Sequence, residues 1–470
     1  MESRSIRAAL PAFVLFFLLS LVELINDTTI SARNPHWRPG FWDAGTARVI
    51  VTQVSNMSSA YILGSSLRTL SHHKAIRLNI VSILLATIAT HASSCFLPTW
   101  MHLNAVVGPL AKFLGGGSHA SKFLTLTVLH SRNTPCARTI YSYMTGFITV
   151  LAQVLGPILV TRLSRRSSHW SGLVAGILCL TACGIAIFLN STNYATQELS
   201  QDESGSVTDT LLSSRRYSHE DSSHPDDGVV SPVGLLKICL GLKAPPREKI
   251  LAFTPWICFF IAISQASRPL FATYAQQRCG LSPTEAGNLW LLRNEISLFI
   301  FGVLLPCLIS MEANTRLFSN NINLSIGRCS VTLMALGAIM ISVSDSSLAI
   351  TIGLIINTFG VSSNLSLLCF TANRLPSSAV GPVLMSFALS ESVGSLVGIV
   401  IIYPTYQWRI DEKTPFYAGS LLYVFCGVSV NLSQSSISSC THWKTKLNYT
   451  AITAVICRFF GKSHQQETED

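Results

Sequence analysis

Ionisable side chains within apolar stretches are the candidates for chemistry in this sequence. Glu391 lies in a long apolar stretch, with Gly394 and Gly398 shortly after it. An ionisable group at membrane depth is costly, so such a group is a functional candidate by default. We expect Glu391 to carry a proton, with a structural hydrogen bond to a neighbouring helix as the alternative.

Other polar residues occupy similar positions. Arg293 and Glu295 share one apolar stretch, where we expect them to face opposite charges across a cavity. Arg268 precedes Pro269 and either joins this pathway or extends to the lipid headgroups. Glu23 and Asp27 end the first apolar stretch, and we interpret them as interfacial residues. Uncharged candidates, which could instead hydrogen-bond between helices, are Gln153, Asn357 and Asn364.

Several kinds of chemistry find no support in the residue pattern. The 13 cysteines include no CxxC pair, and Cys179 and Cys183 are best read as small apolar residues. The phosphate-binding pattern Gly-x-x-x-x-Gly-Lys-Ser/Thr is missing, which argues against an ATP-driven pump. His91 and His102 have no carboxylate nearby in the sequence, as a membrane acyltransferase would need. We therefore expect no enzyme activity, no metal and no cofactor.

Composition indicates the environment of the chain. Charged residues make up 12% of the 470 residues and hydrophobic residues 49%, whereas soluble proteins average about a quarter charged residues. An integral membrane protein is therefore expected. The net charge of +10 comes from basic residues scattered between apolar stretches, which suits contact with lipid headgroups rather than nucleic acid.

A helix needs about 20 mostly apolar residues to cross a bilayer, and the sequence predicts about twelve such spans. Residues 1–190 are expected to form an N-terminal six-helix bundle and residues 251–433 a C-terminal one. Residues 191–250 are polar and serine-rich, which predicts a largely disordered cytoplasmic linker. Residues 434–470 are expected to form a cytoplasmic tail. The predicted spans are 8–26, 46–64, 79–98, 102–121, 139–161, 171–190, 251–272, 286–309, 328–345, 347–371, 380–403 and 416–433.

Basic residues in short loops predict that both termini lie in the cytoplasm. Lys122 is assigned to a cytoplasmic loop in this scheme. The group Arg162, Arg165 and Arg166 falls on the opposite side and violates the rule. The side on which that loop lies stays open.

Short motifs, in order along the chain, carry a family resemblance. They are Leu114–Gly117, Thr134-Pro135 with Arg138-Thr139, Gly156-Pro157, Tyr274 with Leu281–Gly287, Leu305-Pro306, and Ser390-Glu391 with Gly394 and Gly398. Over residues 8–433 the chain resembles a fungal-type member of the major facilitator superfamily. The resemblance implies an all-α integral membrane protein with two six-helix bundles that rock around a central cavity.

The resemblance also suggests roles for individual residues. Gly156 and Pro157 predict a kinked or closely packed helix, and Gly394 and Gly398 are grouped with them. Arg68 stands in the loop between spans two and three, where the family carries a gating signature. The aspartate and inner glycine of that signature are absent here, so a non-transporting sensor is an alternative.

The expected function is secondary active transport of a small amphipathic organic molecule by alternating access. Proton-coupled export of a drug or secondary metabolite is implied by the resemblance, with uptake of a nutrient or an iron chelate as the alternative. Expected partners are the substrate, protons and the bilayer, with a monomeric chain in the plasma membrane.

Overall fold

The computed structural model describes residues 2–33, 44–66, 72–96, 101–133, 135–164, 170–187, 249–315, 322–375 and 377–408. Within these ranges the regular elements are helices, with no strand. Arg68, the expected linker up to residue 248, the expected span 416–433 and the tail lie outside the described residues. The chain divides into the units Met1–Gly427 and Val428–Asp470, and all described residues belong to the first.

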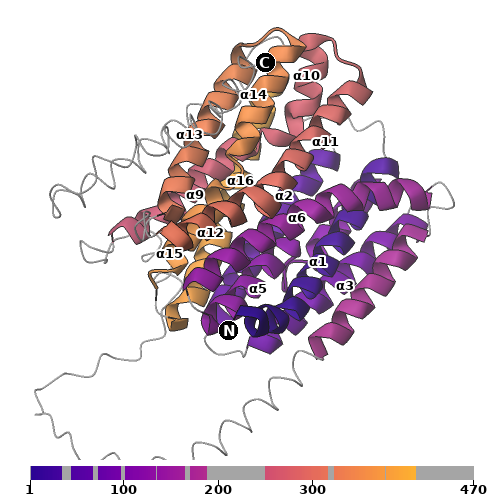
Figure 1. Cartoon of the computed structure of the whole chain (residues 1–470). Helices are drawn as coiled ribbons and strands as arrows, with labels where there is room; N and C mark the ends of the chain where they lie inside the picture. The colour runs from indigo at the N-terminus through magenta and orange to yellow at the C-terminus, as the bar shows by residue number, and fades with distance from the viewer. Residues whose placement is uncertain are drawn as a thin grey trace, which may run out of the picture. The chain divides into compact units, whose positions relative to one another are not determined.

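The helices before the linker are called the N-terminal group. They are α1 (Glu2–Arg33), α2 (Ala44–Ser66), α3 (His72–Phe96), α4 (Met101–Ala111), α5 (Ser118–Arg132), α6 (Pro135–Ser164) and a helix at Trp170–Ile187 (Figure 1). Helix α1 packs against α6, and α2 and α3 pack against α4. At the α1–α6 contact, a Cβ on Gly156 would come within 2.9 Å of the Leu24 side chain, so this glycine allows close packing.

The helices after the linker are called the C-terminal group. They are α9 (Lys249–Gln265), the 3-10 turn η2 (Arg268–Leu270), α10 (Phe271–Cys279), α11 (Pro283–Phe299), the π-helical turn η3 (Ile300–Leu304), α12 (Leu305–Thr315), α13 (Ile322–Val343), α14 (Ser347–Phe359), α15 (Ser363–Ala372) and α16 (Ser377–Trp408) (Figure 1). The predicted spans from 8–26 to 380–403 fall on these helices.

Three spans are interrupted, which the apolar pattern did not predict. Span four divides into α4 and α5, span seven into α9, η2 and α10, and span ten into α14 and α15. The predicted boundary of span four at residue 121 is wrong, because α5 continues to Arg132 and Lys122 lies inside the helix. The prediction that Lys122 belongs to a loop is therefore wrong.

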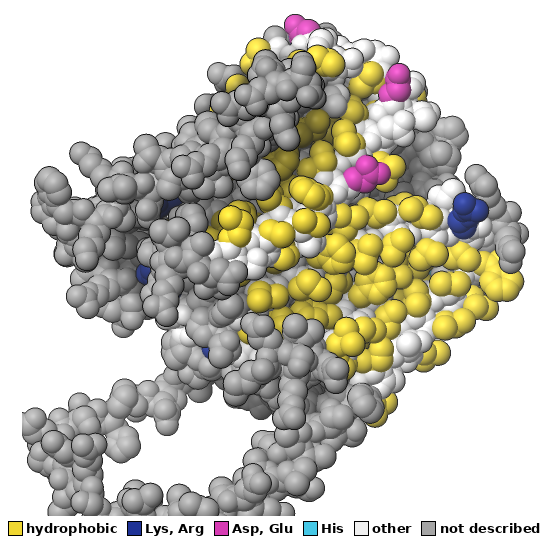
Figure 2. Space-filling view, in the orientation of Figure 1, with side chains coloured by type: hydrophobic (Ala, Val, Ile, Leu, Met, Phe, Trp, Pro, Cys, Tyr) yellow, Lys and Arg dark blue, Asp and Glu magenta, His cyan; other side chains and the backbone are white. Residues whose placement is uncertain are grey.

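Apolar side chains cover much of the outer surface, as expected where helices meet lipid. Figure 2 shows a broad apolar face broken by a few charged side chains. In the described part of the chain, eight helices are long and apolar enough to cross a membrane.

Gly394 and Gly398 form a flat strip on α16 against which α9 packs. A Cβ at Gly394 would lie 2.4 Å from the Phe259 carbonyl oxygen, and one at Gly398 would lie 2.6 Å from that of Ile263. Because backbone atoms cannot move aside as side chains can, only glycine fits here. Small residues four positions apart commonly allow such close approach of membrane helices.

We predict that Gly398→Val destabilises the protein by about 1–3 kcal/mol, the usual cost of overpacking, or more because the obstacle is backbone. The matched control is Gly184→Val, since a Cβ at this exposed helical glycine would meet nothing within 4 Å. Thermal unfolding of the two purified variants in detergent tests this. Equal melting temperatures would show that the α9–α16 contact tolerates added bulk.

Candidate functional site: buried charges at an interrupted span

The fourth span is interrupted between Ala111 and Ser118, where the sequence reads Lys-Phe-Leu-Gly-Gly-Gly. Gly116 has φ 73°, in the left-handed region that favours glycine. Gly117 is the residue before α5, and a Cβ on it would lie 2.5 Å from a carboxylate oxygen of Glu23. The glycines therefore allow both the break and the close approach of a charged side chain.

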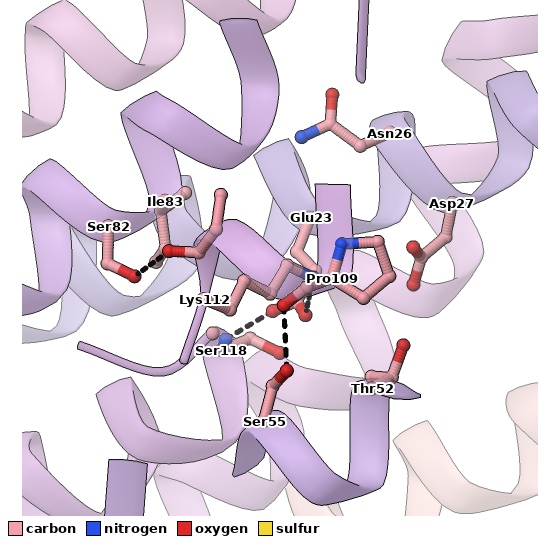
Figure 3. A network of polar contacts seen from close by, with 12 residues as sticks. Glu23, Asn26, Asp27, Thr52, Ser55, Ser82, Ile83, Pro109, Lys112 and Ser118 are labelled. Carbon is pink, nitrogen blue, oxygen red and sulfur yellow. Dashed lines mark hydrogen bonds and ion pairs between the residues drawn. The ribbon is translucent and has the colours of Figure 1, made fainter. Parts of the chain in front are cut away.

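Side chains of α2 and α3 donate hydrogen bonds to backbone carbonyl oxygens on both sides of the interruption. Buried backbone groups in a membrane must be paired inside the protein. Ser55 Oγ donates to Pro109 O at 2.8 Å (Figure 3), and Ser82 Oγ donates to Ala111 O at 3.0 Å. Asn79 Nδ2 donates to Gly115 O at 2.7 Å and to Gly117 O at 3.2 Å. Asn79 also accepts a hydrogen bond from Ser121 Oγ at 2.6 Å, so it contacts both sides of the break.

Glu23 of α1 places its carboxylate at the same break (Figure 3). One oxygen pairs with the Lys112 ammonium, and the other accepts a hydrogen bond from the Ser118 backbone N–H at the start of α5. Glu23 and Lys112 are only 7% and 4% exposed. The positive end of the α5 dipole and the ammonium together stabilise the negative charge away from water.

Glu391 of α16 is at the centre of a second cluster, which joins the two groups of helices. Its Oε1 accepts a hydrogen bond from Asn364 Nδ2 of α15 at 3.1 Å. Its Oε2 lies 3.8 Å from Lys122 Nζ and 3.9 Å from His119 Nε2, both on α5. His119 Nε2 also lies 3.3 Å from the Ala388 carbonyl oxygen. Charged side chains of the N-terminal and C-terminal groups thus meet at Glu391.

The first turns of α5 connect these two clusters. Ser118 binds Glu23, while His119 and Lys122 face Glu391. Any displacement of α5 therefore alters contacts of both carboxylates. Helix α5 packs against α1 of its own group and against α16 of the other.

Hydrogen bonds without an acidic partner join the two groups of helices along another seam. Arg138 Nη1 of α6 donates to the carbonyl oxygens of Ala372 (3.0 Å) and Leu375 (3.4 Å), at the end of α15. Thr139 Oγ1 accepts from Asn323 Nδ2 at 3.1 Å and from Asn373 Nδ2 at 2.8 Å. Tyr143 OH donates to Asn323 Oδ1 at 3.1 Å and lies 3.0 Å from Ser366 Oγ. We call these contacts of α6 with α13 and α15 the α6 seam.

The remaining predicted site residues are distributed over the structure. Arg293 is buried, with its guanidinium 4.5 Å from the Trp290 ring centroid. Asn357 Nδ2 donates to the Met334 carbonyl oxygen at 2.9 Å, a bond between helices. Arg268 is half-buried in the interruption between α9 and α10. Pro157, Gln153 and Glu295 are exposed on their helices.

Among the predicted site residues in the described ranges, Asn364 is the one that contacts Glu391. The sequence reasoning missed His119 and Lys112, and it placed Glu23 at the interface and Lys122 in a loop. A usable signal was present: Lys112 precedes a run of three glycines, and a buried lysine requires a carboxylate. Among the described residues, no three His, Cys, Asp or Glu side chains are grouped to hold a metal ion.

This arrangement defines a class: an all-helical, multi-pass membrane protein with interrupted spans, a buried ion pair in its N-terminal group and charged side chains where its two groups of helices meet. No family model and no curated protein matches the sequence. Solved structures do match. The human organic anion transporter MFSD10 (TETRAN) matches with TM-score 0.65 and 15% identity, over 91% of this chain and 99% of that chain.

Two further structures match in the same way. The E. coli fucose:proton symporter FucP has TM-score 0.61 and 12% identity, covering 91% of this chain and 99% of that one. A bacterial homologue of the iron transporter ferroportin, in an outward-facing state, has TM-score 0.62 and 13% identity, again covering 91% and 99%. The chain therefore has the major facilitator fold, with about twelve transmembrane helices in two six-helix bundles.

We predict that Lys112→Met destabilises the protein by about 3–5 kcal/mol, because Glu23 is left as a buried charge without its partner. The double variant Glu23→Gln/Lys112→Met removes both charges and should recover much of the loss. Thermal unfolding in detergent measures both effects. A double variant no more stable than Lys112→Met alone would contradict an ion pair at this position.

Proposed function

We propose that this chain is a secondary active transporter that works by alternating access. The observation that carries the proposal is the contact of Glu391 in the C-terminal group with Lys122 and His119 in the N-terminal group. The major facilitator fold supports it, since transporters built from repeated helix groups bind ligands near the midplane between these groups. Interrupted spans four, seven and ten fit the same design, because discontinuous helices commonly surround such sites.

Protons are the proposed energy source, with Glu391 as carrier. As a carboxylate, Glu391 attracts the Lys122 ammonium 3.8 Å away, because charges interact more strongly in a low-dielectric interior than in water. Protonation removes this attraction and leaves α5 free to move relative to α16. Deprotonation restores the attraction, so the charge state of Glu391 biases the contact between the two groups of helices.

Glu23 and Lys112 are the proposed means of passing this change into the N-terminal group. Because α5 begins at the Glu23 carboxylate, movement of its first turn strains or breaks that hydrogen bond. The α6 seam would open in the same transition, since it joins α6 with α13 and α15.

The proposed substrate is a small amphipathic organic molecule, and the proposed direction is export of a drug or secondary metabolite across the plasma membrane. We propose a monomer with both termini in the cytoplasm. Uptake is the second candidate, because one similar structure is a fucose:proton symporter. The altered loop around Arg68 keeps a non-transporting sensor as a further alternative.

Purified protein in liposomes tests the proposal, with the fluorescent amphipathic cation ethidium as probe. A gradient of one pH unit provides about 1.4 kcal/mol per proton, enough for about a tenfold ethidium ratio across the membrane. The wild-type protein should reach such a ratio. Glu391→Gln should lose this pH-driven accumulation yet retain exchange of ethidium for ethidium, which needs no proton.

The matched control is Glu285→Gln, a carboxylate variant in the first turn of α11, where glutamine can keep the hydrogen bond to the Ser282 backbone. It should accumulate ethidium like the wild type. Unchanged accumulation in Glu391→Gln would exclude Glu391 as the proton carrier. A wild-type protein that exchanges no ethidium would contradict this substrate class.

A further inference from the structure

Glu295 lies on an exposed face of α11, near the middle of a membrane span. The span is Pro283–Met311, and its middle residue is Ser297, so Glu295 lies within about 3 Å of the centre at 1.5 Å per residue. One helical turn away on either side, Leu291 and Phe299 are 43% and 53% exposed. The carboxylate therefore stands on a face that is otherwise suited to lipid.

Nothing among the described residues neutralises this carboxylate. None of them forms an ion pair or hydrogen bond with Glu295. Arg293, two positions earlier, is buried and packs on Trp290. A charged group at this depth costs about 2.5 kcal/mol or more, so a lipid-facing carboxylate without a partner calls for a ligand.

Gln153 of α6 supplies a second polar group at the same depth. It is exposed, and it lies three positions after Val150, the middle of span Ala137–Leu163. Helices α6 and α11 pack against each other. A Cβ on Gly302 would contact the Phe147 side chain and one on Gly146 the Phe301 side chain, so the two helices lie close together near the middle of their spans. At 1.5 Å per residue, Gln153 lies about 4.5 Å along the helix from the middle of its span, so both polar residues are near the membrane centre on adjoining helices.

We propose that Glu295 and Gln153 form a lateral binding site for a lipophilic cation, reached from within the bilayer. The ligand would pair its positive charge with the Glu295 carboxylate and pack its apolar body on Leu291, Phe299 and neighbouring Val303. Figure 2 shows how extensively apolar side chains cover this view of the molecule. The site is separate from the Glu391 cluster, since Glu295 faces outward and Glu391 faces α5.

Two other occupants fit less well. A second copy related by a two-fold axis presents the same surface patch, and in the described part of α6 and α11 that patch offers no basic side chain near Glu295. A partner helix lying along both α6 and α11 would tie the two groups of helices together. A small cation would leave the two groups free to move. This argument against a partner helix rests on the proposed transport cycle.

Equilibrium binding of tetraphenylphosphonium to purified protein in phosphatidylcholine nanodiscs tests the site. The wild type should bind it saturably. Glu295→Gln, nearly identical in shape, should weaken the affinity by at least about tenfold, or about 1.4 kcal/mol. Gln153→Leu should weaken it by a smaller factor. Glu285→Gln, on the same helix at the end of the span, should stay within about twofold.

Tetraphenylborate, an anion of similar size and shape, controls for simple partitioning into apolar surface. Its binding should not weaken in Glu295→Gln. Equal tetraphenylphosphonium affinity in wild type and Glu295→Gln would overturn the proposal. So would loss of binding in Glu391→Gln with retention in Glu295→Gln, which would assign the cation to the central cluster, or a wild-type dimer that Glu295→Gln dissociates. Because binding is measured without flux, a failed transport proposal would leave this result standing.

Discussion

The interior of a bilayer offers no water, so each interrupted helix must find partners for its backbone within the protein. The fourth span meets this constraint through side chains on α2 and α3, which bind the carbonyl groups on both sides of the break. At the start of α5, the Glu23 carboxylate accepts the hydrogen bond of the Ser118 backbone N–H. The same requirement explains why Lys112 can be buried: its ammonium balances the carboxylate that the helix start attracts.

The position of α5 follows from that constraint, and α5 in turn places His119 and Lys122 against Glu391. Helix α5 therefore connects the Glu23–Lys112 ion pair inside one group of helices to the Glu391 contact with the other, which the proposed transport cycle makes sensitive to protons. The α6 seam is built differently, from hydrogen bonds that involve a guanidinium, amides and hydroxyl groups. Such bonds can be exchanged for water at low cost when the groups separate, which suits a contact that opens and closes.

The apolar pattern predicted the helical membrane fold and nearly all of the described spans. Each span is an apolar run of about 20 residues, which is the length that a helix needs to cross a bilayer. The apolar pattern could not predict the breaks. Phe113 and Leu114 continue the apolar pattern through the interruption of span four, whereas the break depends on Asn79, which is distant in sequence. Glu391 was predicted as a site residue because a carboxylate in a long apolar run is conspicuous, and its role stays a prediction. Lys122 was assigned to a loop because the predicted span ended at residue 121, and only tertiary structure reveals that Glu391 lies opposite. The boundaries of the two predicted bundles, at residues 190 and 251, stay predictions.

The account depends on the two groups of helices separating at the α6 seam during each cycle. Cysteines replacing Thr139 and Asn373, whose side chains lie 2.8 Å apart, in an otherwise cysteine-free protein would join the groups by a disulfide. A protease site placed in residues 191–249 would let a gel show how much protein is cross-linked. We predict that oxidation arrests ethidium flux in liposomes and that reduction restores it. Undiminished flux through fully cross-linked protein would contradict alternating access by this chain.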